Sequence, residues 1–266
     1  MRPPTSALAL AAFLSPATVT AACNRDLLQQ SANEFIQALS MGMADHMQNI
    51  ATQGFTYLEN NKPTDIKAGV VSKSPHVAFN RTLADMQVCA TFTEMVAPGP
   101  EKPYLIHAQI RHNASEESNA VYLIDAIVAT TGSFKGFNAS ETMRLAEEED
   151  WGFVPQDTWD TRATLVAAGA MYLDLVETQN PFGRVAMGDP CQVLDGSQYG
   201  NCTSVGATEL TYSSRRSVVD ESVDAINVFA LGERKDGSMA MESVTLRLGV
   251  ERVRYVHSLS VPIEAS

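Results

Sequence analysis

The sequence repeats itself, and this repeat limits the folds that the chain can adopt. Apolar residues recur at helical spacing near the start of the chain and again in its second half. Three segments align in the same order at offsets of 137, 135 and 132 residues: 28–39 with 165–176, 80–92 with 215–227, and 121–130 with 253–262. We therefore predict two copies of one folding unit that differ by small changes in loop length.

Each copy is predicted to contain one or more helices followed by antiparallel strands. Alternation of apolar and polar residues predicts strands at 104–110, 121–129, 223–231, 243–248 and 253–261. Because helices precede a run of strands, this order favours an α+β fold over an alternating α/β fold. We expect a first copy at residues 23–135, a linker at 136–160 and a second copy at 161–266.

The N-terminus has the parts of a secretory signal peptide. Arg2 supplies a positive charge, residues 7–14 form a short apolar run, and residues 20–22 offer a cleavage site of small side chains. The apolar run is too short to span a bilayer, which needs about 20 residues. A buried N-terminal helix is the alternative interpretation. We predict that residues 1–22 are removed, that the protein is secreted or enters the secretory pathway, and that it has no transmembrane segment.

Four cysteines follow the predicted cleavage site, and four cysteines in an oxidising compartment indicate two disulfides. Cys191 and Cys202 flank a glycine-rich loop, so we pair them with each other and pair Cys23 with Cys89. The spacing lacks the paired CxxC motifs of a zinc site. Sequons for N-linked glycans, which fit a secreted glycoprotein, occur at Asn80, Asn113, Asn138 and Asn201.

Composition excludes several classes of protein. With 19 basic and 31 acidic residues, a net charge of −12 and a pI near 4.8, the chain offers no basic face for nucleic acid. A hydrophobic fraction of 45% is enough to build a sizeable core. The sequence contains no GxGxxG motif, P-loop or GxSxG motif. We expect no metal and no other cofactor, small-molecule partners only, and leave oligomerisation open.

Four segments carry a resemblance to a known family: YLENNKPT at 57–64, VCATFTEM at 88–95, the loop between Cys191 and Cys202, and RYVHSLSV at 254–261. Together with the doubled helix-and-sheet pattern, they resemble a secreted fungal family of tandem SnoaL-like (nuclear transport factor 2-like) proteins. The resemblance covers nearly the whole mature chain. It implies two cone-like units, each a helix on a curved antiparallel sheet.

This family includes the hetero-Diels–Alderases of tropolone–sesquiterpene (meroterpenoid) biosynthesis. The resemblance therefore implies a cofactor-free enzyme that dehydrates a hydroxymethyl tropolone or phenol to an o-quinone methide, which a humulene-type alkene then captures. Small apolar or aromatic metabolites would be its substrates. Related folds also serve as dehydratases, isomerases and binding proteins, since a fold does not fix a function. The alternatives are a secreted protein that only binds a small molecule, and a dehydratase or isomerase of another secondary metabolite.

Two polar residues at matching positions of the copies are the candidate catalytic residues. Asp125 stands between Leu123 and Ile127 on one face of a predicted strand, and His257 is its counterpart in the second copy. In a cone interior, burial would raise the pKa of the carboxyl, and an imidazole could exchange a proton near neutral pH. The alternative interpretation is that neighbouring groups satisfy both side chains as part of the structure.

A second set of residues is a candidate for substrate binding. Arg81 and Arg216 each precede an aspartate by four residues, and we interpret each pair as a salt bridge that fixes a bend. The functional alternative is a guanidinium that stabilises an oxyanion on the substrate. Tyr57 and Asn60 are candidates for hydrogen bonds to a substrate, although the segment is also typical of a turn. Trp151, near the joint, either covers an apolar ligand or packs between the domains.

Overall fold

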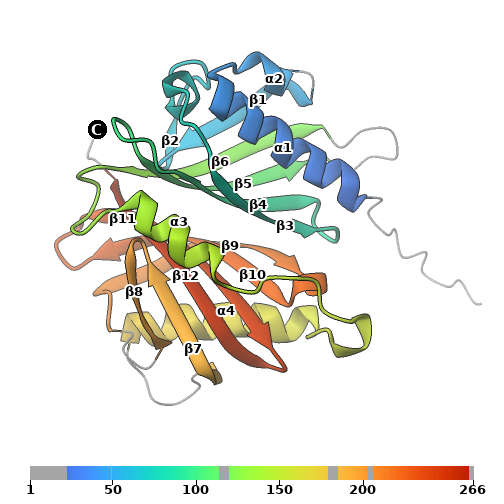
Figure 1. The fold of residues 1–266 in the computed structure, drawn as a ribbon, viewed down its shortest axis with the longest axis vertical. Helices are drawn as coiled ribbons and strands as arrows, with labels where there is room; N and C mark the ends of the chain where they lie inside the picture. Colours follow the sequence, from blue (N-terminus) through green and yellow to red (C-terminus); the bar gives the residue numbers. More distant parts are fainter. Residues whose placement is uncertain (1–22, 49, 114–119, 179–184, 203–205, 264–266) are drawn as a thin grey trace, which may run out of the picture.

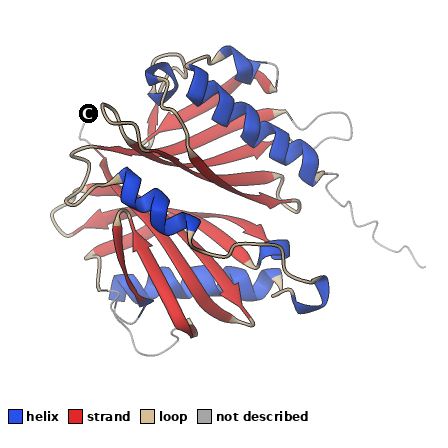
Figure 2. Ribbon diagram, viewed as in Figure 1, coloured by secondary structure: helices blue, strands red, loops and turns tan. Residues whose placement is uncertain are grey.

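The computed structural model describes residues 23–48, 50–113, 120–178, 185–202 and 206–263, so the predicted signal peptide lies outside the described residues. Two six-stranded sheets lie face to face, with one long helix on the outer side of each (Figures 1 and 2). Both disulfides that we predicted are present, Cys23–Cys89 and Cys191–Cys202. They are consistent with a protein of the extracellular space or the secretory pathway.

The first copy contains helices α1 (Arg25–Met41) and α2 (Asp45–Gln48), the 3₁₀ turn η1 (Val70–Lys73), and strands β1 (Ala51–Glu59), β2 (Lys62–Pro63), β3 (Phe79–Asp85), β4 (Ala90–Ala97), β5 (Tyr104–His112) and β6 (Val121–Thr130). Its sheet has the order β2-β1-β6-β5-β4-β3. Helix α1 begins where the Asn24 side chain accepts a hydrogen bond from the backbone N–H of Asp26, and it ends at Gly42, whose φ is +68°.

The second copy contains helix α4 (Arg162–Thr178), the 3₁₀ turn η4 (Glu221–Val223), and strands β7 (Met187–Asp195), β8 (Gln198–Asn201), β9 (Leu210–Asp220), β10 (Ala225–Arg234), β11 (Met239–Gly249) and β12 (Arg252–Ile263). Its sheet order, β8-β7-β12-β11-β10-β9, matches that of the first copy strand for strand. The parallel pair Glu59–Ala126 of the first sheet has its counterpart in the parallel pair Asp195–Ser258 of the second sheet. The prediction of two repeated units in an α+β chain is therefore confirmed.

Between the copies, the segment that we expected to be a linker contains helix α3 (Ala139–Glu147) and the 3₁₀ turn η2 (Gln156–Thr158). Helix α3 begins where the Asn138 side chain accepts a hydrogen bond from the backbone N–H of Glu141. All four sequon asparagines are exposed. Among the described residues, no helix combines the length and the apolar character that crossing a bilayer requires.

Three apolar layers stabilise the fold. Phe35 on α1 packs against one face of the first sheet, and Leu173 on α4 packs against the corresponding face of the second. The other faces of the two sheets pack against each other, with Phe92 and Phe229 at this contact, which we call the intersheet layer. Both faces of each sheet are therefore buried over much of their area.

Two reciprocal ion pairs join the copies. Arg25, at the start of α1, donates to both carboxylate oxygens of Asp220 in the second copy, at 2.9 and 2.6 Å. Arg162, at the start of α4, donates in the same way to Asp85 in the first copy, at 2.8 Å to each oxygen. Both aspartates are fully buried. Each copy thus supplies the cation that neutralises a buried carboxylate of the other.

The predicted salt bridges within β3 and β9 are therefore wrong. Arg81 pairs instead with Glu94, and Arg216 pairs with Asp125. The physical reason is the geometry of a strand, in which residues four apart point to the same face but lie about 13 Å apart. The side chains of such residues find partners on neighbouring strands or on the opposite sheet.

Candidate functional site

The structure gathers several of the candidate residues into a buried cluster of charges in the intersheet layer. His257 on β12 lies between two carboxylates: its Nδ1 is 2.8 Å from Glu94 Oε1, and its Nε2 is 2.6 Å from Glu149 Oε2. Arg81 lies 3.3 Å from Glu94. The side chains of His257 and Glu149 are each 1% exposed, so a substrate would reach them only if the sheets separated.

The cluster carries balanced charges. Burial alone would lower the pKa of His257, but the two flanking carboxylates raise it to about 9. Burial alone would raise the pKa of Glu94, but the charge of His257 and the hydrogen bonds of two histidines hold it well below its ordinary value. With both ring nitrogens engaged, His257 has no free position for a substrate. These contacts favour the structural interpretation of this residue.

Trp151, in the segment that joins the copies, contacts residues of this cluster. Its Nε1 donates to Glu149 at 2.7 Å, its ring stacks on Tyr255, and the Arg81 guanidinium lies 4.1 Å from its ring centroid. A cation over an aromatic face in a desolvated site contributes about 2 kcal/mol. Trp151 therefore packs between the sheet and the joint, as the alternative interpretation held.

Asp125 also faces the opposite sheet and not the helix-covered interior that we expected. Its carboxylate accepts from Arg216, and burial raises its pKa in spite of that guanidinium. A period of two defines two faces of a strand but does not say which of them lines an interior. The neighbours Ile124 and Ile127 are both fully buried, on opposite faces, so the hydrophobic pattern does not distinguish the two faces.

Tyr57 and Asn60 are engaged in local structure. The Tyr57 hydroxyl donates to Glu59 at 2.9 Å, and the side chain of Asn60 makes two hydrogen bonds to the backbone of Val128, at 2.8 and 3.0 Å. Asn60 has a φ of +51°, as asparagine in a turn often has. Both residues therefore build the turn after β1.

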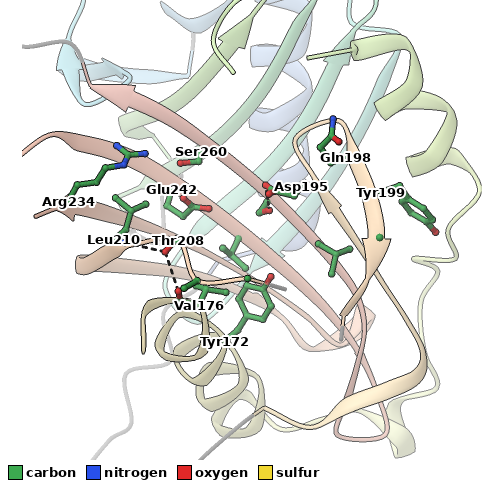
Figure 3. Close-up of a pocket in the computed structure, with 16 residues that line it drawn as sticks. Tyr172, Val176, Asp195, Gln198, Tyr199, Thr208, Leu210, Arg234, Glu242 and Ser260 are labelled. Carbon is green, nitrogen blue, oxygen red and sulfur yellow. Dashed lines mark hydrogen bonds between the residues drawn. The ribbon is translucent and has the colours of Figure 1, made fainter. Parts of the chain in front are cut away.

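A cavity of about 480 Å³, partly open to solvent, lies in the second copy between α4 and the sheet face that it covers (Figure 3). Ligand cavities in proteins commonly have volumes of about 300–1,000 Å³. Valine, leucine and alanine side chains line part of the wall. Polar groups also line it, among them Tyr172 on α4, Asp195 on β7, Arg234 on β10, Glu242 on β11, and Ser258 and Ser260 on β12.

Glu242 is the unusual group in this cavity. The residue is 4% exposed, and its Oε2 has no hydrogen-bond partner among the described residues. Burial, followed by the negative charge of Asp195, raises the pKa of Glu242 from 4.5 to about 8. Burial and both of these carboxyl groups also raise the pKa of Tyr172. At neutral pH, Glu242 is therefore a neutral acid that can donate a proton.

Asp195 stands at the exposed side of the same cavity. It accepts a hydrogen bond from the Ser258 hydroxyl at 2.7 Å. Asp195 is exposed, whereas Glu242 is buried, so the two carboxyl groups differ in their access to water. Their strands β7 and β11 are separated by β12, about 9–10 Å across the sheet, and the two residues are also out of register by two positions, since Asp195 pairs with Ser258 and Glu242 with Ser260.

The first copy has a filled interior at the matching positions. Strand register aligns Glu242 with Ile106, Ser258 with Ala126, and Ser260 with Val128, and the sequence repeat aligns Tyr172 on α4 with Phe35 on α1. All four residues of the first copy belong to its apolar core beneath α1 or pack against it. Glu242 and Tyr172 are not among the residues predicted for the site, although the repeat carries a signal: each is polar where the other copy is apolar.

Comparisons with known proteins assign no activity. A family model described as a domain of unknown function (DUF8021) matches residues 158–260, which include Tyr172, Asp195 and Glu242. A crystal structure of a DUF4783 family protein from Bacteroides fragilis YCH46 is 12% identical, with a TM-score of 0.27, and covers 36% of this chain and 96% of its own. No curated protein matches. Residues 158–260, which cover most of the second copy, are thus similar to a family of unknown function.

Proposed function

We propose that the second copy binds a small, largely apolar metabolite in its cavity and catalyses the loss of water from it by proton transfer. The observation that carries this proposal is Glu242, a buried carboxyl with an unpartnered oxygen in the wall of a ligand-sized cavity, where burial raises its pKa to about 8. A general acid of this kind accelerates a reaction by about 10²–10⁴-fold when its pKa is close to the working pH. Asp195 is the matching base.

The reaction that the family resemblance implies fits this pair of groups. Glu242 donates its proton to the hydroxyl of a hydroxymethyl tropolone or phenol, the C–O bond breaks, and water leaves. The ring hydroxyl gives its proton to Asp195, which leaves a neutral o-quinone methide. A humulene-type alkene then adds across the C=C–C=O unit and forms one C–C and one C–O bond. Proton exchange with solvent restores Glu242 as the acid and Asp195 as the base.

The cavity contributes to the cycloaddition by orientation. Holding two reactants in an aligned geometry lowers a barrier by about 7–11 kcal/mol in favourable cases. The cone shape of a SnoaL-like unit is part of this proposal, since it would close the sheet around both reactants beneath α4. Support comes from the contact of α4 with the second sheet around the cavity.

The test compares the wild type with Glu242→Gln and Asp125→Asn, using a hydroxymethyl tropolone and humulene. The adduct is measured by mass and chirality, and tropolone binding is measured by calorimetry. We expect the wild type to form a single stereoisomer above the background rate. Glu242→Gln should lose at least 100-fold in turnover while retaining affinity, because glutamine keeps the shape but has no acidic proton. Asp125→Asn, in the intersheet layer, should keep its turnover.

Three outcomes would contradict the proposal. Formation of racemic adduct at the background rate would show that the protein does not catalyse the reaction of this substrate pair. If the protein bound the tropolone or another hydroxyl-bearing metabolite but converted none of them, it would be a binding protein, which is the alternative function. Loss of turnover in Asp125→Asn, with turnover kept in Glu242→Gln, would move the site to the intersheet layer.

A further inference from the structure

The turn between β7 and β8 connects the cavity to a part of the chain that precedes the second copy. Asp195 and Gln198, at the two ends of this turn, both line the cavity (Figure 3). Gly196 and Ser197, between them, are buried against the segment that leads into α3 and against α3 itself. The position of the cavity wall therefore depends on residues outside the family match.

Hydrogen bonds hold the turn from the side of α3. The backbone N–H of Asn138 donates to Ser197 Oγ at 2.8 Å. The Thr142 hydroxyl lies 2.8 Å from Ser197 Oγ and 3.1 Å from the carbonyl oxygen of Gly196. Thr142 is 2% exposed and Ser197 is 7% exposed, so water does not compete freely for these groups.

Close packing reinforces these bonds. A Cβ at Gly196 would lie 2.7 Å from the Phe134 ring, and Gly196 has a φ of +58°, so only glycine fits there without strain. A Cβ at Gly136 would lie 2.4 Å from the end of the Gln198 side chain, which can shift, so this contact is less restrictive. The turn and the segment before α3 therefore fit together without spare space.

Strand β12 holds the same turn from the other side. The backbone N–H of Gly196 donates to the carbonyl oxygen of Ser258 at 2.7 Å, and the Ser258 hydroxyl donates to Asp195. Asp195 is thus fixed between β12 and α3. A shift of α3 would carry the turn, and with it the carboxylate, toward or away from Glu242.

We infer that α3 and the residues just before it belong to the cavity's site, with Thr142 as a positioning residue that sets where Asp195 stands relative to Glu242. This inference rests on the proposed function for the roles of the two carboxyl groups. It extends the site to residues 134–142, although the family match begins at residue 158. The second copy alone would therefore be an incomplete site.

The experiment uses Glu242 as a reporter of the position of Asp195, because the charge of Asp195 contributes to the raised pKa of Glu242. The full secreted chain is labelled with ¹³C at its glutamate carboxyl carbons and titrated by NMR, and Glu242→Gln identifies the signal. Thr142→Val removes the hydroxyl at nearly constant volume, whereas Thr142→Ser retains it. Ser197→Ala removes the same contact from the turn and serves if Thr142→Val does not fold.

We expect Thr142→Val to change the pKa of Glu242 by roughly half a unit or more, downward when Asp195 moves away and upward when it moves closer, and Thr142→Ser to leave it unchanged. An unchanged pKa in both Thr142→Val and Ser197→Ala would overturn the inference. So would an equal change in Thr142→Ser, because the hydroxyl would then not be the cause. No substrate is present in this titration, so a failure of the proposed reaction would not affect its result.

Discussion

The raised pKa of Glu242 makes a prediction about stability that needs no substrate. The folded protein holds a proton on this carboxyl up to a pH of about 8, whereas the unfolded chain releases it near the ordinary value of 4.5. Between these two values the folded state binds more protons, so the free energy of unfolding falls as the pH rises. A rise in pKa from 4.5 to about 8, at about 1.4 kcal/mol per pH unit, corresponds to about 5 kcal/mol.

Glu242→Gln should remove this pH dependence, because an amide does not titrate in either state. We expect the variant and the wild type to be similar in stability near pH 5. Near pH 9 the variant should be more stable by about 5 kcal/mol, or by about 10 °C or more in Tm for a chain of this size. The measurement is the Tm by circular dichroism at intervals from pH 5 to 9.

The wild type contains a second group, His257, whose titration also lowers the stability as the pH rises. Because the variant and the wild type both contain it, its effect cancels when their stabilities are compared. The pKa of His257 is raised from 6.5 to about 9, so the stability that it contributes is complete below pH 6.5 and is lost as the pH rises through 9. Glu242→Gln should keep this loss. Glu147→Gln, on the exposed side of α3, is the control for removing one acidic group. A difference in Tm between Glu242→Gln and the wild type that stays constant from pH 5 to 9 would refute the reasoning.

Three further predictions concern the joint, the cavity and the sequons. Arg162→Gln should lower the free energy of unfolding, measured by urea denaturation, by about 3 kcal/mol, because it leaves Asp85 buried without its cation. The control Arg144→Gln, in an exposed pair, should lower it by under about 1 kcal/mol, and equal losses in the two variants would contradict the prediction. The double variant Tyr172→Phe, Glu242→Ile places the apolar residues of the first copy at the matching positions of the second. It should fold, and calorimetry should show that it no longer binds the tropolone. For protein expressed through a eukaryotic secretory pathway, endoglycosidase treatment should lower its mass at the four exposed sequons, and an unchanged mass would show that they are unused.

The repeat and the disulfides could be predicted from the sequence because both depend on order along the chain. The aligned segments kept their order, and in the structure the matching strands have the same neighbours in each sheet. Cys191 and Cys202 are close in sequence and pair across the β7–β8 hairpin, which fixed the remaining pair as well. Chain proximity is enough to settle such features.

The partners of the charged residues could not be predicted in the same way. Arg81, Glu94 and His257 come from both copies and meet only because the two sheets pack face to face. Alternation identified the strands but not the face that each residue would occupy, since both faces of the sheets are apolar. Glu242 could not be predicted as a site residue for a related reason. It lies in a strand of mostly buried residues, and only the comparison with Ile106 in the first copy shows that it is unusual.

The exchange of arginines between the copies has a consequence for how this chain can be divided. Each half, expressed alone, would lose the arginine and the backbone N–H of the other copy that its aspartate binds, and would expose the apolar face that now meets the other sheet. Neither half is then an autonomous domain, despite having its own complete sheet and helix. The smallest cooperative unit is the whole tandem, and we expect it to unfold in a single transition. Cutting the chain at the joint would yield two insoluble fragments that can fold only on each other.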